Sequence, residues 1–297
     1  MTDIAVIGAS SFTGKRFVEL MTERGHRCEG ISFRGDGWFG DLQRLHYKYI
    51  VNFAALNVVA PSWELASNYF HVNVTKIAVL AKFLRDQPIT KYVHISTPEV
   101  YGSCGGKITE DMNLRPSTPY ALSRATAEDL LRMEFERYGL PVVFTRACNV
   151  YGPGQQLYRL IPKVLWHIKK GIPFPLEGGG TSQRAFLYVD DVCDAIEKVM
   201  VRGTSGEAYN ISSELLKISY VVHECYIACG ETRNFEQVPG RQGQDEQYWL
   251  DDTKFKRELG DGGPKVSLEE GVARVRDWMD ANWDTFKDAP TDYEFRP

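Results

Sequence analysis

The stretch Asp3-Ile-Ala-Val-Ile-Gly-Ala-Ser-Ser-Phe-Thr-Gly14 decides the fold of this chain. It opens with a short apolar run, Asp3 to Gly8, of the kind that forms a buried strand. Apolar residues then recur at helical spacing from Thr13 to Arg24, and Gly25 follows as a stop signal. A tight glycine turn between a strand and a helix lets backbone N–H groups approach a pyrophosphate. We therefore expect this turn to bind a dinucleotide, through Gly8, Ser10, Ser11, Phe12, Thr13 and Gly14.

The spacing of this turn is irregular. It reads Gly-x-x-Ser-x-x-Gly, with Ser11 at the position of the middle glycine of the Rossmann consensus. Two glycines alone are a weak signal, because a turn from a strand to a helix often uses glycine for steric reasons. A purely structural role for Gly8 and Gly14 is therefore the alternative.

Further along, short β-rich apolar runs alternate with amphipathic helical stretches, which is the pattern of a parallel sheet covered by helices on both faces. The expected strands are Arg27–Phe33, Tyr49–Ala55, Tyr92–Ser96 and Pro141–Cys148, and the expected helices are Asn73–Arg85 and Pro119–Tyr138. Only about fifteen residues, Arg34 to Lys48, separate the second and third strands, so we expect a truncated connection there. The predicted fold class is α/β, a Rossmann-like doubly wound parallel sheet with a smaller C-terminal substrate-binding lobe.

The second lobe is expected to begin near residue 151, where Pro- and Gly-rich loops replace the regular alternation. The expected domains are residues 1–150 for the dinucleotide, 151–285 mainly for the substrate, and a loose tail at 286–297. Ala185–Val189 and Ala208–Ile211 have the pattern of strands that could return to the first sheet, so segments near 184–212 are assigned to the first domain. Ser267-x-x-Glu270 predicts a capping box for a last helix that ends near Trp283.

The composition and charge of the chain limit the classes of protein to which it can belong. The chain carries 35 Lys and Arg against 39 Asp and Glu, a formal net charge of -4, and this interspersed charge disfavours a nucleic-acid binder. No apolar stretch has membrane-spanning length, and the first apolar segment is too short for a signal peptide. The six cysteines lack Cys-x-x-Cys pairs and neighbouring histidines, so no metal site is expected, and Cys225 and Cys229 are expected in the core. We expect a cytoplasmic protein with reduced thiols that binds neither membrane nor nucleic acid.

The end of the second strand bears on the choice of cofactor. An acidic residue there would bind the ribose 2′-OH of NAD, whereas this chain has Ser32-Phe-Arg34. A cationic Arg34 suits a 2′-phosphate, so we expect NADP, with NAD as the alternative in which Arg34 is a solvated surface residue. Asp41 and Leu42 are expected to face the adenine, although Asp41 could instead cap the next helix.

Tyr120 and Arg124 form a candidate catalytic pair. They stand four residues apart near the start of a predicted helix and therefore on one face of it. A tyrosine with its ordinary pKa of about 10 is a poor base, but a fixed cation beside it favours the phenolate. Proton removal from a sugar hydroxyl by Tyr120 could then accompany hydride transfer. The alternative is a core tyrosine beside a surface arginine.

The segment Ser96-Thr-Pro-Glu-Val-Tyr-Gly102 follows a buried strand, at the carboxyl edge where open α/β sheets bind ligands. The hydroxyl of Ser96 or Thr97 could hydrogen-bond a reacting hydroxyl, and Glu99 could remove a proton next to a carbonyl. As an alternative, the segment is simply a turn in which Glu99 is solvated.

Several further motifs occur in a fixed order along the chain. They are Asn52-Phe-Ala-Ala55, Asn73-Val-Thr75, His94-Ile-Ser-Thr97, Glu99-Val-Tyr-Gly102, Pro119-Tyr-Ala121, Arg146 with Asn149-Val-Tyr-Gly-Pro153, and Arg184 with Tyr188-Val-Asp-Asp191. With the glycine turn they resemble the extended short-chain dehydrogenase/reductase family, the NAD-dependent epimerases and dehydratases of nucleotide sugars. The resemblance runs from Ile4 to about Trp283. It implies that the cofactor site also includes Ala54, Ala55, Asn73, Ser96, Tyr120 and Arg124, and that the chain forms a homodimer through the helices Asn73–Arg85 and Pro119–Tyr138.

Two features resemble the sugar-nucleotide 4,6-dehydratases in particular. One is Thr97-Pro-Glu99, and the other is Pro239-Gly-Arg-Gln-Gly-Gln-Asp245. In those enzymes the C4 hydroxyl is oxidised by NAD(P)+, a glutamate takes the C5 proton, water leaves from C6, and the hydride returns there. The resemblance implies that Tyr120 is the C4 base, Thr97 its hydroxyl partner and Glu99 the C5 base. It also implies that the nucleoside-diphosphate sugar is held by Asn149, Arg184 and Arg241.

Two departures from the family pattern leave other functions open. Arg124 stands where the family has a lysine that bonds the nicotinamide ribose, and Pro98 stands where several dehydratases have an acid. GDP-mannose-type dehydratases are similar at Pro98, since they have a small residue there, and they use NADP. A nucleotide-sugar 4-epimerase would need only Tyr120 and a hydroxyl partner, and it is the first alternative. The second is a regulatory protein that binds the same ligands with little catalysis.

Overall fold

The computed structural model describes residues 3–34, 37–43, 47–240, 249–261 and 263–293. Its contacts divide the chain into two units. Unit 1 comprises Met1–Ala147, Val192–Ile211 and Leu250–Gly262, and unit 2 comprises Cys148–Asp191, Ser212–Trp249 and Gly263–Pro297. Residues 184–191, which were expected in the first domain, therefore belong to unit 2. Two later segments return to unit 1: the expected one, which ends at Ile211, and a second one near 250–262.

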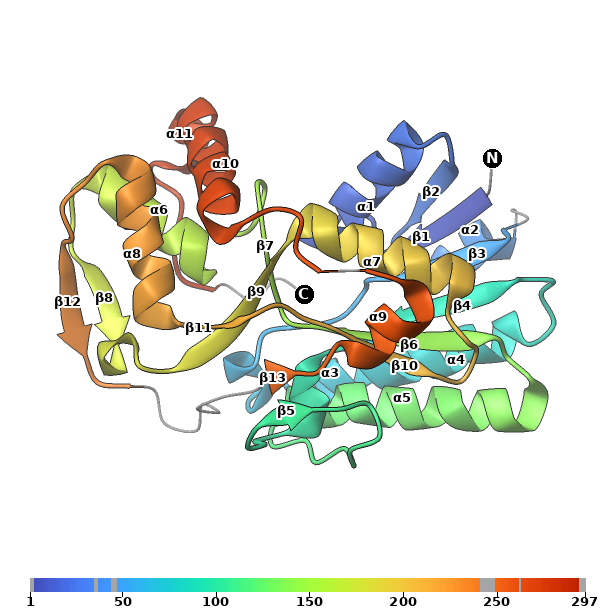
Figure 1. Cartoon of the computed structure of the whole chain (residues 1–297). Coiled ribbons are helices and arrows are strands. Elements are labelled where there is room, and N and C mark those ends of the chain that lie inside the picture. The colour runs from blue at the N-terminus through green and yellow to red at the C-terminus, as the bar shows by residue number, and fades with distance from the viewer. Residues whose placement is uncertain (1–2, 35–36, 44–46, 241–248, 262, 294–297) are drawn as a thin grey trace. The chain divides into compact units, whose positions relative to one another are not determined.

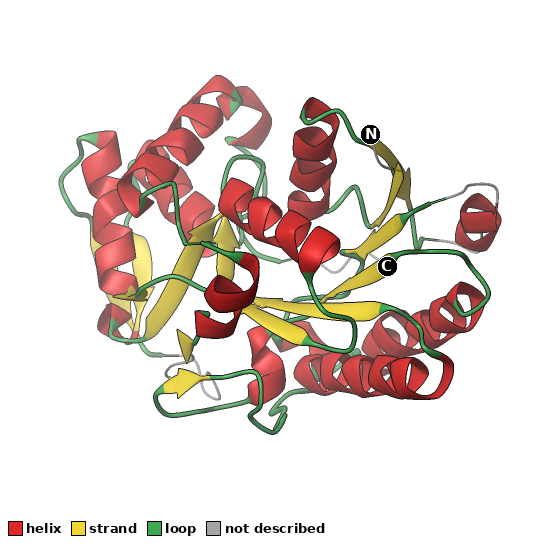
Figure 2. Ribbon diagram, turned by 45° about the vertical axis from the view of Figure 1, so that its right-hand side comes forward, coloured by secondary structure: helices red, strands yellow, loops and turns green. Residues whose placement is uncertain are grey.

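Unit 1 is built on a six-stranded sheet of strand order β10-β6-β4-β3-β1-β2, in which all neighbours are parallel. The strands are β1 (Asp3–Ile7), β2 (Arg27–Ile31), β3 (Tyr49–Asn52), β4 (Lys91–Ile95), β6 (Val142–Ala147) and β10 (Ala208–Ile211). Figure 2 shows these strands with helices on both faces of the sheet. The expected α/β fold is confirmed, and Ala208–Ile211 does return to the first sheet.

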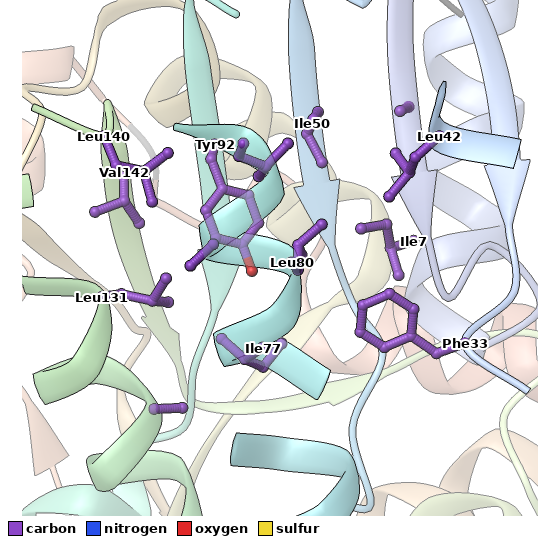
Figure 3. Packing of buried hydrophobic residues seen from close by; sticks show 14 of the residues in the cluster. Ile7, Phe33, Leu42, Ile50, Ile77, Leu80, Tyr92, Leu131, Leu140 and Val142 are labelled. Carbon is purple, nitrogen blue, oxygen red and sulfur yellow. The ribbon is translucent and has the colours of Figure 1, made fainter. Parts of the chain in front are cut away.

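Helices α4 (Lys76–Leu84) and α5 (Pro119–Tyr138) cover one face of this sheet, and α1 (Phe12–Glu23) with the unit 1 part of α7 (Val189–Arg202) covers the other (Figure 1). Side chains alternate between the faces of a strand, and Ile7 of β1 and Tyr92 of β4 point toward α4 and α5. There they pack with Ile77, Leu80 and Leu131 in a continuous apolar cluster (Figure 3). The core therefore fixes the strands of the sheet against these two helices.

The connection between β2 and β3 is truncated, as expected. Its one described helix is the six-residue α2 (Trp38–Gln43), and β2 is the edge strand of the sheet. Leu42 of α2 is 2% exposed and points into the apolar cluster (Figure 3).

The helical region before β4 begins earlier than Asn73. It starts with α3 (Ala66–Phe70), continues through a π-helical turn, His71–Thr75, and passes directly into α4. The sequence prediction missed the start of this helical region, because the polar Ser-Asn pair interrupts the apolar pattern of α3. A π-turn widens the helix locally and is found often at functional sites.

Helix α5 has the predicted bounds. Thr118 caps its N-terminus by accepting the N–H of Ala121 at 3.1 Å, Pro119 occupies its first position, and Gly139 ends it with φ +71°. Near α5 in sequence lie the 3-10 turn η3 (Pro98–Tyr101) and β5 (Lys107–Ile108). The remaining unit 1 elements are the 3-10 turn η1 (Ala60–Ser62) and α9 (Thr253–Leu259).

Unit 2 contains two small sheets and a group of packed helices. A three-stranded sheet is formed by β7 (Asn149–Tyr151), β9 (Gln183–Tyr188) and β11 (Leu215–Lys217), and a two-stranded one by β8 (Phe174–Glu177) and β12 (Phe235–Val238). Helices α6 (Leu160–Lys170), α8 (Ile218–Cys229) and α10 (Leu268–Ala281) pack on one another, and the remaining short elements are η4 (Gly178–Gly180) and α11 (Trp283–Phe286). The short strand β13 (Trp249–Leu250), whose Leu250 belongs to unit 1, pairs with β5. The expectation that Ala185–Val189 joins the first sheet was wrong, since β9 pairs with β7 and β11.

The predicted capping box is present, because Ser267 Oγ accepts the N–H of Glu270 at 3.2 Å at the start of α10. The expected loose tail is wrong as far as residue 293. Trp166 Nε1 donates to the Phe286 carbonyl at 3.0 Å, and the rings of Tyr158 and Tyr293 meet edge to face at 5.2 Å. Aromatic contacts thus hold the segment within unit 2.

Candidate active site

The glycine turn between β1 and α1 is compact for a steric reason. Gly8 has φ +78°, and a Cβ on it would lie 2.7 Å from the backbone nitrogen of Ala54. A Cβ on Gly14 would lie 2.4 Å from the Gly8 carbonyl oxygen, while Ser11 Oγ caps α1 by accepting the Gly14 N–H at 3.2 Å. Ser10 is exposed and Phe12 is partly exposed. The turn therefore lies at the N-terminus of a 12-residue helix, the setting in which a pyrophosphate is bound.

The end of β2 exposes the residues expected to choose between NAD and NADP. Ser32 and Arg34 both point outward, and the Arg34 N–H donates to Ser32 Oγ at 3.2 Å. Phe33 between them is buried and packs on Trp38 with ring centroids 4.8 Å apart. Because exposed and buried side chains alternate from Ser32 to Arg34, the Arg34 guanidinium lies at the surface beside the end of β2.

Of the two residues expected at the adenine, only one is at the surface. Asp41 is exposed and lies inside α2, which begins at Trp38, so it is not the N-cap of that helix. Leu42 is buried in the core described above.

The end of β3 is held by Asn52, which is 1% exposed. Its Oδ1 accepts the N–H of Ala54 at 2.9 Å, and its Nδ2 donates to Tyr92 Oη at 3.1 Å on the neighbouring strand. Ala54 and Ala55 are partly exposed. The chain after β3 is therefore fixed where it passes against Gly8, and both alanines remain accessible.

Asn73 lies in the π-turn and is fully buried. Its Oδ1 accepts the Leu56 N–H at 2.9 Å, and its Nδ2 donates to the Leu56 carbonyl at 3.1 Å and to Ser123 Oγ at 3.0 Å. The side chain ties the loop after β3 to α5, so it shapes the surroundings of the predicted cofactor site.

Three buried side chains run from β4 to α5. Tyr92 Oη and His94 Nδ1 are 3.1 Å apart, and His94 Nε2 lies 3.1 Å from Arg124 Nη2, which also donates to the Ile95 carbonyl. Burial, and then the charge of Arg124, hold the pKa of His94 well below its ordinary value, so the imidazole is neutral. Arg124 is 2% exposed, and its Nη1 has no hydrogen-bond partner within the described part of the chain.

Sequence reasoning did not assign a role to His94, although the residue was part of a quoted motif. The signal was present, since a histidine in an otherwise apolar central strand must find polar partners. Its partner on α5 could not be identified before the helix was placed beside the strand.

The expected acid–base residues all lie in unit 1. Ser96 continues β4, and its N–H donates to the Thr145 carbonyl at 2.8 Å. Thr97 Oγ1 accepts the Glu99 N–H at 3.4 Å and so caps the 3-10 turn that carries Glu99. Glu99 is half-buried. The turn is thus part of the sheet edge and not a solvated loop.

Tyr120 occupies the first turn of α5 and is 6% exposed. Its ring meets Tyr69 of α3 edge to face with centroids 6.1 Å apart. Because both Tyr120 and Arg124 are buried, the alternative of a surface arginine is wrong.

A buried ion pair lies behind this edge. Arg146 of β6 binds Glu128 of α5 through Nε, at 3.0 Å from Oε1, and through Nη2, while its Nη1 donates to Tyr101 Oη. Tyr101 Oη donates to Asn210 Oδ1 at 3.0 Å. Sequence reasoning quoted Arg146 only as a motif residue and missed Glu128, because a charged residue at one helical position gives no sign of burial.

Asn149 and Arg184, two of the residues expected to hold the nucleoside diphosphate, lie in unit 2, whereas the other residues expected to contact the substrate, Thr97, Glu99 and Tyr120, lie in unit 1. Asn149 of β7 donates through Nδ2 to the Ala185 carbonyl at 3.2 Å, and Arg184 of β9 donates through Nη1 to the Gln183 carbonyl at 2.7 Å. Both are half-buried. Arg241 lies outside the described residues. Strands β7 and β9 are neighbours, so Asn149 and Arg184 share one sheet.

The cysteines of the chain are not among the candidate site residues. All six cysteines are in the thiol form, and burial raises the pKa of the Cys225 thiol, as expected for core packing. Among the described residues, no group of three His, Cys, Asp or Glu could hold a metal ion. Those residues also contain no helix long and apolar enough to cross a membrane.

Comparison with known proteins places these features in a family. The model of the NAD dependent epimerase/dehydratase family matches residues 4–212. The dTDP-glucose 4,6-dehydratase of Xanthomonas campestris pv. campestris is 32% identical over 93% of this chain and 93% of its own. The crystal structure of DesIV, the dTDP-glucose 4,6-dehydratase of Streptomyces venezuelae, was solved with NAD bound. It superposes with a TM-score of 0.89 and 29% identity over 96% of this chain and 99% of its own.

A second solved structure shares the fold. The UDP-glucose 4-epimerase of Thermus thermophilus, in complex with NAD, superposes with a TM-score of 0.87 and 25% identity over 94% of this chain and 99% of its own. These matches confirm the family and the Rossmann-like fold expected from the motifs.

Proposed function

The chain belongs to the NAD-dependent epimerase/dehydratase family, and from that premise we propose that it is a nucleotide-sugar 4,6-dehydratase. The observation that carries the proposal is Glu99. Its side chain is half-buried on a 3-10 turn that is capped by Thr97 and follows β4 at the carboxyl edge of the sheet. This turn is in contact with α5, the helix that carries Tyr120. An epimerisation at C4 needs no such carboxylate, whereas a dehydration needs a base for the C5 proton.

The residues present fit a nicotinamide dinucleotide. The turn from Gly8 to Gly14 stands at the N-terminus of α1, where backbone N–H groups would bind a pyrophosphate, and Arg124 Nη1 is a buried donor without an acceptor among the described residues. Bound there, the dinucleotide would supply a reversible acceptor for the hydride that C4 loses and C6 gains. The guanidinium of Arg124 would donate to the ribose in place of the family lysine and would favour the phenolate of Tyr120.

Proton transfers then fall to two side chains. Tyr120 takes the proton of the C4 hydroxyl as the C4–H bond breaks, which leaves a 4-keto sugar, and Thr97 orients that hydroxyl. The carbonyl acidifies C5–H, and Glu99 removes that proton as a carboxylate.

The departing C6 hydroxyl also needs a proton. Pro98, the residue between Thr97 and Glu99, has no proton to give. Glu99 carries the C5 proton after the preceding step, so it is the acid that passes this proton to the hydroxyl, and water leaves. One carboxyl group then serves as both base and acid, and its charge is restored at the end of the elimination. As C6 receives the hydride, C5 takes up a proton from water through Glu99, and Tyr120 releases the proton of the C4 hydroxyl to solvent, so both side chains return to their starting states.

Substitution of Glu99 separates the dehydratase from the epimerase. With nucleoside-diphosphate hexoses, Glu99→Gln is expected to lower formation of the 4-keto-6-deoxy product by about 10²- to 10⁴-fold. Glu136→Gln, an exposed position on α5, is the matched control and should retain full activity. Retention of most activity by Glu99→Gln, with a 4-epimer as product, would favour the epimerase, and absence of any wild-type turnover would favour the regulatory alternative.

For the cofactor we propose NADP, held through its 2′-phosphate by Arg34. The support is the exposed guanidinium at the end of β2 and the absence of an acidic residue in Ser32-Phe-Arg34. The solved dehydratase and epimerase were crystallised with NAD, which is the alternative. Dissociation constants of NADP+ and NAD+ for the wild type and Arg34→Ala test this preference.

For the substrate we propose a nucleoside-diphosphate hexose whose diphosphate is held by Asn149, Arg184 and Arg241. Arginine forks match phosphate oxygens in bidentate geometry. Calorimetric titration with dTDP-, UDP- and GDP-hexoses should identify the nucleotide, and Arg184→Met should weaken binding of every one of them.

For the assembly we propose a homodimer through α4 and α5. Large apolar side chains are exposed on both helices, namely Val79, Leu122 and Met133. A second copy of the same face would cover them by two-fold symmetry. Light scattering should give twice the mass of the chain, and Leu122→Glu should reduce it to that of one chain.

For the location we propose the cytoplasm, because all six cysteines are thiols. Titration of the unfolded protein, purified without reductant, should count six reactive thiols.

A further inference from the structure

Arg124 is satisfied on one side only. Its Nη2 donates to His94 Nε2 at 3.1 Å and to the Ile95 carbonyl, whereas Nη1 is buried and meets no acceptor in the described part of the chain. A buried guanidinium N–H without an acceptor is costly and therefore rare. An acceptor for Nη1 from outside the chain is the natural complement.

The contact between Arg124 and His94 determines the tautomer of the histidine. A guanidinium can only donate, so His94 Nε2 must be the acceptor and carry no proton. The neutral ring then has its proton on Nδ1, which faces Tyr92 Oη at 3.1 Å. Tyr92 Oη also receives Asn52 Nδ2 at 3.1 Å, from the strand next to β4.

This hydrogen-bonded chain joins two parts of the predicted cofactor site. Asn52, at one end, also accepts the N–H of Ala54, the residue that lies against Gly8. Arg124 is at the other end, and the tyrosine and histidine between them are fully buried. The position of the guanidinium is therefore set from the sheet and not from its own helix alone.

We propose that His94 is a positioning residue, whose neutral imidazole holds the plane of the Arg124 guanidinium so that Nη1 donates to the ribose of a bound nicotinamide dinucleotide. The proposal rests on the proposed function. A lysine ammonium can rotate its donors toward an acceptor, whereas a guanidinium must have its whole plane oriented. His94 thus supplies the orientation that an arginine needs at a position where the family has lysine.

Two isosteric substitutions separate the two nitrogens of His94. In His94→Gln the amide oxygen can occupy the place of Nε2 and still accept from Arg124. In His94→Asn the shorter amide reaches only the place of Nδ1, so the contact with Tyr92 can persist while the contact with Arg124 is lost. The readout is the dissociation constant of NAD+ and of NADP+, measured by calorimetry.

We expect His94→Gln to bind the dinucleotide within about twofold of the wild type, and His94→Asn to bind it about tenfold more weakly or worse. In an Arg124→Met background, His94→Asn should cause no further loss, because His94 acts through Arg124. The proposal would be overturned if His94→Gln and His94→Asn bound the dinucleotide with equal affinity. It would also be overturned if His94→Asn weakened dinucleotide binding as much in the Arg124→Met background as in the wild type.

A spectroscopic measurement covers the case in which His94→Asn does not fold. The ¹⁵N spectrum of the wild-type histidines, with the His94 resonances identified by their loss in His94→Gln, should report a protonated Nδ1 and a bare Nε2. A proton on Nε2 overturns the proposal. A wild type that binds neither dinucleotide contradicts the proposed function itself, whereas the other negative outcomes leave that function intact and remove only the role of His94.

Discussion

The carboxylate of Glu128 and the guanidinium of Arg146 form a buried ion pair in which Oε1 accepts from Nε at 3.0 Å. Glu128 belongs to α5, the helix of Tyr120, and Arg146 belongs to β6. Arg146 also donates to Tyr101 Oη, at the end of the 3-10 turn that carries Glu99. The ion pair therefore connects the two elements that present the proposed catalytic groups.

Breaking this pair should be costly. Glu128→Gln leaves the Arg146 charge buried without its counter-ion, and the free energy of unfolding should fall by about 3–5 kcal/mol. Urea unfolding measures it. The matched control is Glu270→Gln on α10, whose partner Arg274 is bound at 2.6 Å with both side chains largely exposed. That change should cost at most about 1 kcal/mol, and similar losses in the two variants would contradict the prediction.

The same pair predicts a dependence of stability on pH. Burial by itself raises the pKa of Glu128, but the charge and hydrogen bonds of Arg146 outweigh it and hold the pKa below the ordinary value of 4.5. Since the folded state binds the proton less readily than the unfolded state, the contribution is fully present above pH 4.5. It is lost as the pH falls from there through the folded pKa.

Urea unfolding from about pH 7 to about pH 3 should therefore give a difference in stability between the wild type and Glu128→Gln that narrows only in acid. A difference that stays constant over the whole range would show that the carboxylate charge is not what stabilises the fold.

Substitution of Gly8 should affect cofactor binding beyond its effect on the fold. A Cβ at Gly8 would meet Ala54 N at 2.7 Å, so Gly8→Ala must shift either the turn or the loop after β3. We expect the affinity for the dinucleotide to drop about tenfold or more, which corresponds to roughly 1.4 kcal/mol.

Gly25→Ala is the control for Gly8→Ala. Gly25 has φ +82°, also in the left-handed region, but no atom lies within 4 Å of its added Cβ. The Gly25→Ala variant should lose about 1 kcal/mol of stability and keep its affinity for the dinucleotide. If both variants bind the dinucleotide equally well, the turn is not its binding site.

Substitution of Arg34 tests the choice of cofactor. Arg34→Ala should raise the dissociation constant of NADP+ about tenfold, because one charge-assisted contact with the 2′-phosphate is lost, and should leave that of NAD+ unchanged. Arg27→Ala, an exposed arginine at the start of the same strand, should change neither. Parallel effects of Arg34→Ala on both dinucleotides, or tighter wild-type binding of NAD+, would assign the site to NAD.

Much of the fold could be predicted from local pattern. The bounds of α5 follow from Thr118, Pro119 and Gly139, each of which acts on its own helix end. The place of Ala185–Val189 could not be predicted in this way, because an apolar strand pairs with whichever edge the tertiary fold brings to it. It joined β7 and β11 of unit 2. The contacts that Phe286 and Tyr293 make with Trp166 and Tyr158 likewise join residues more than a hundred positions apart.

The sequence by itself determined the family and the glycine turn, and it predicts the acid–base residues, because all of these depend on residue types at short, fixed spacings. Only the tertiary structure decided how Arg124 is held and that Glu128 is buried. Both depend on partners thirty and eighteen residues away, on neighbouring strands of the sheet. The hydrogen bonds of Arg124 and Glu128 are strong because they are buried. That burial arises only when the face of α5 packs against the sheet.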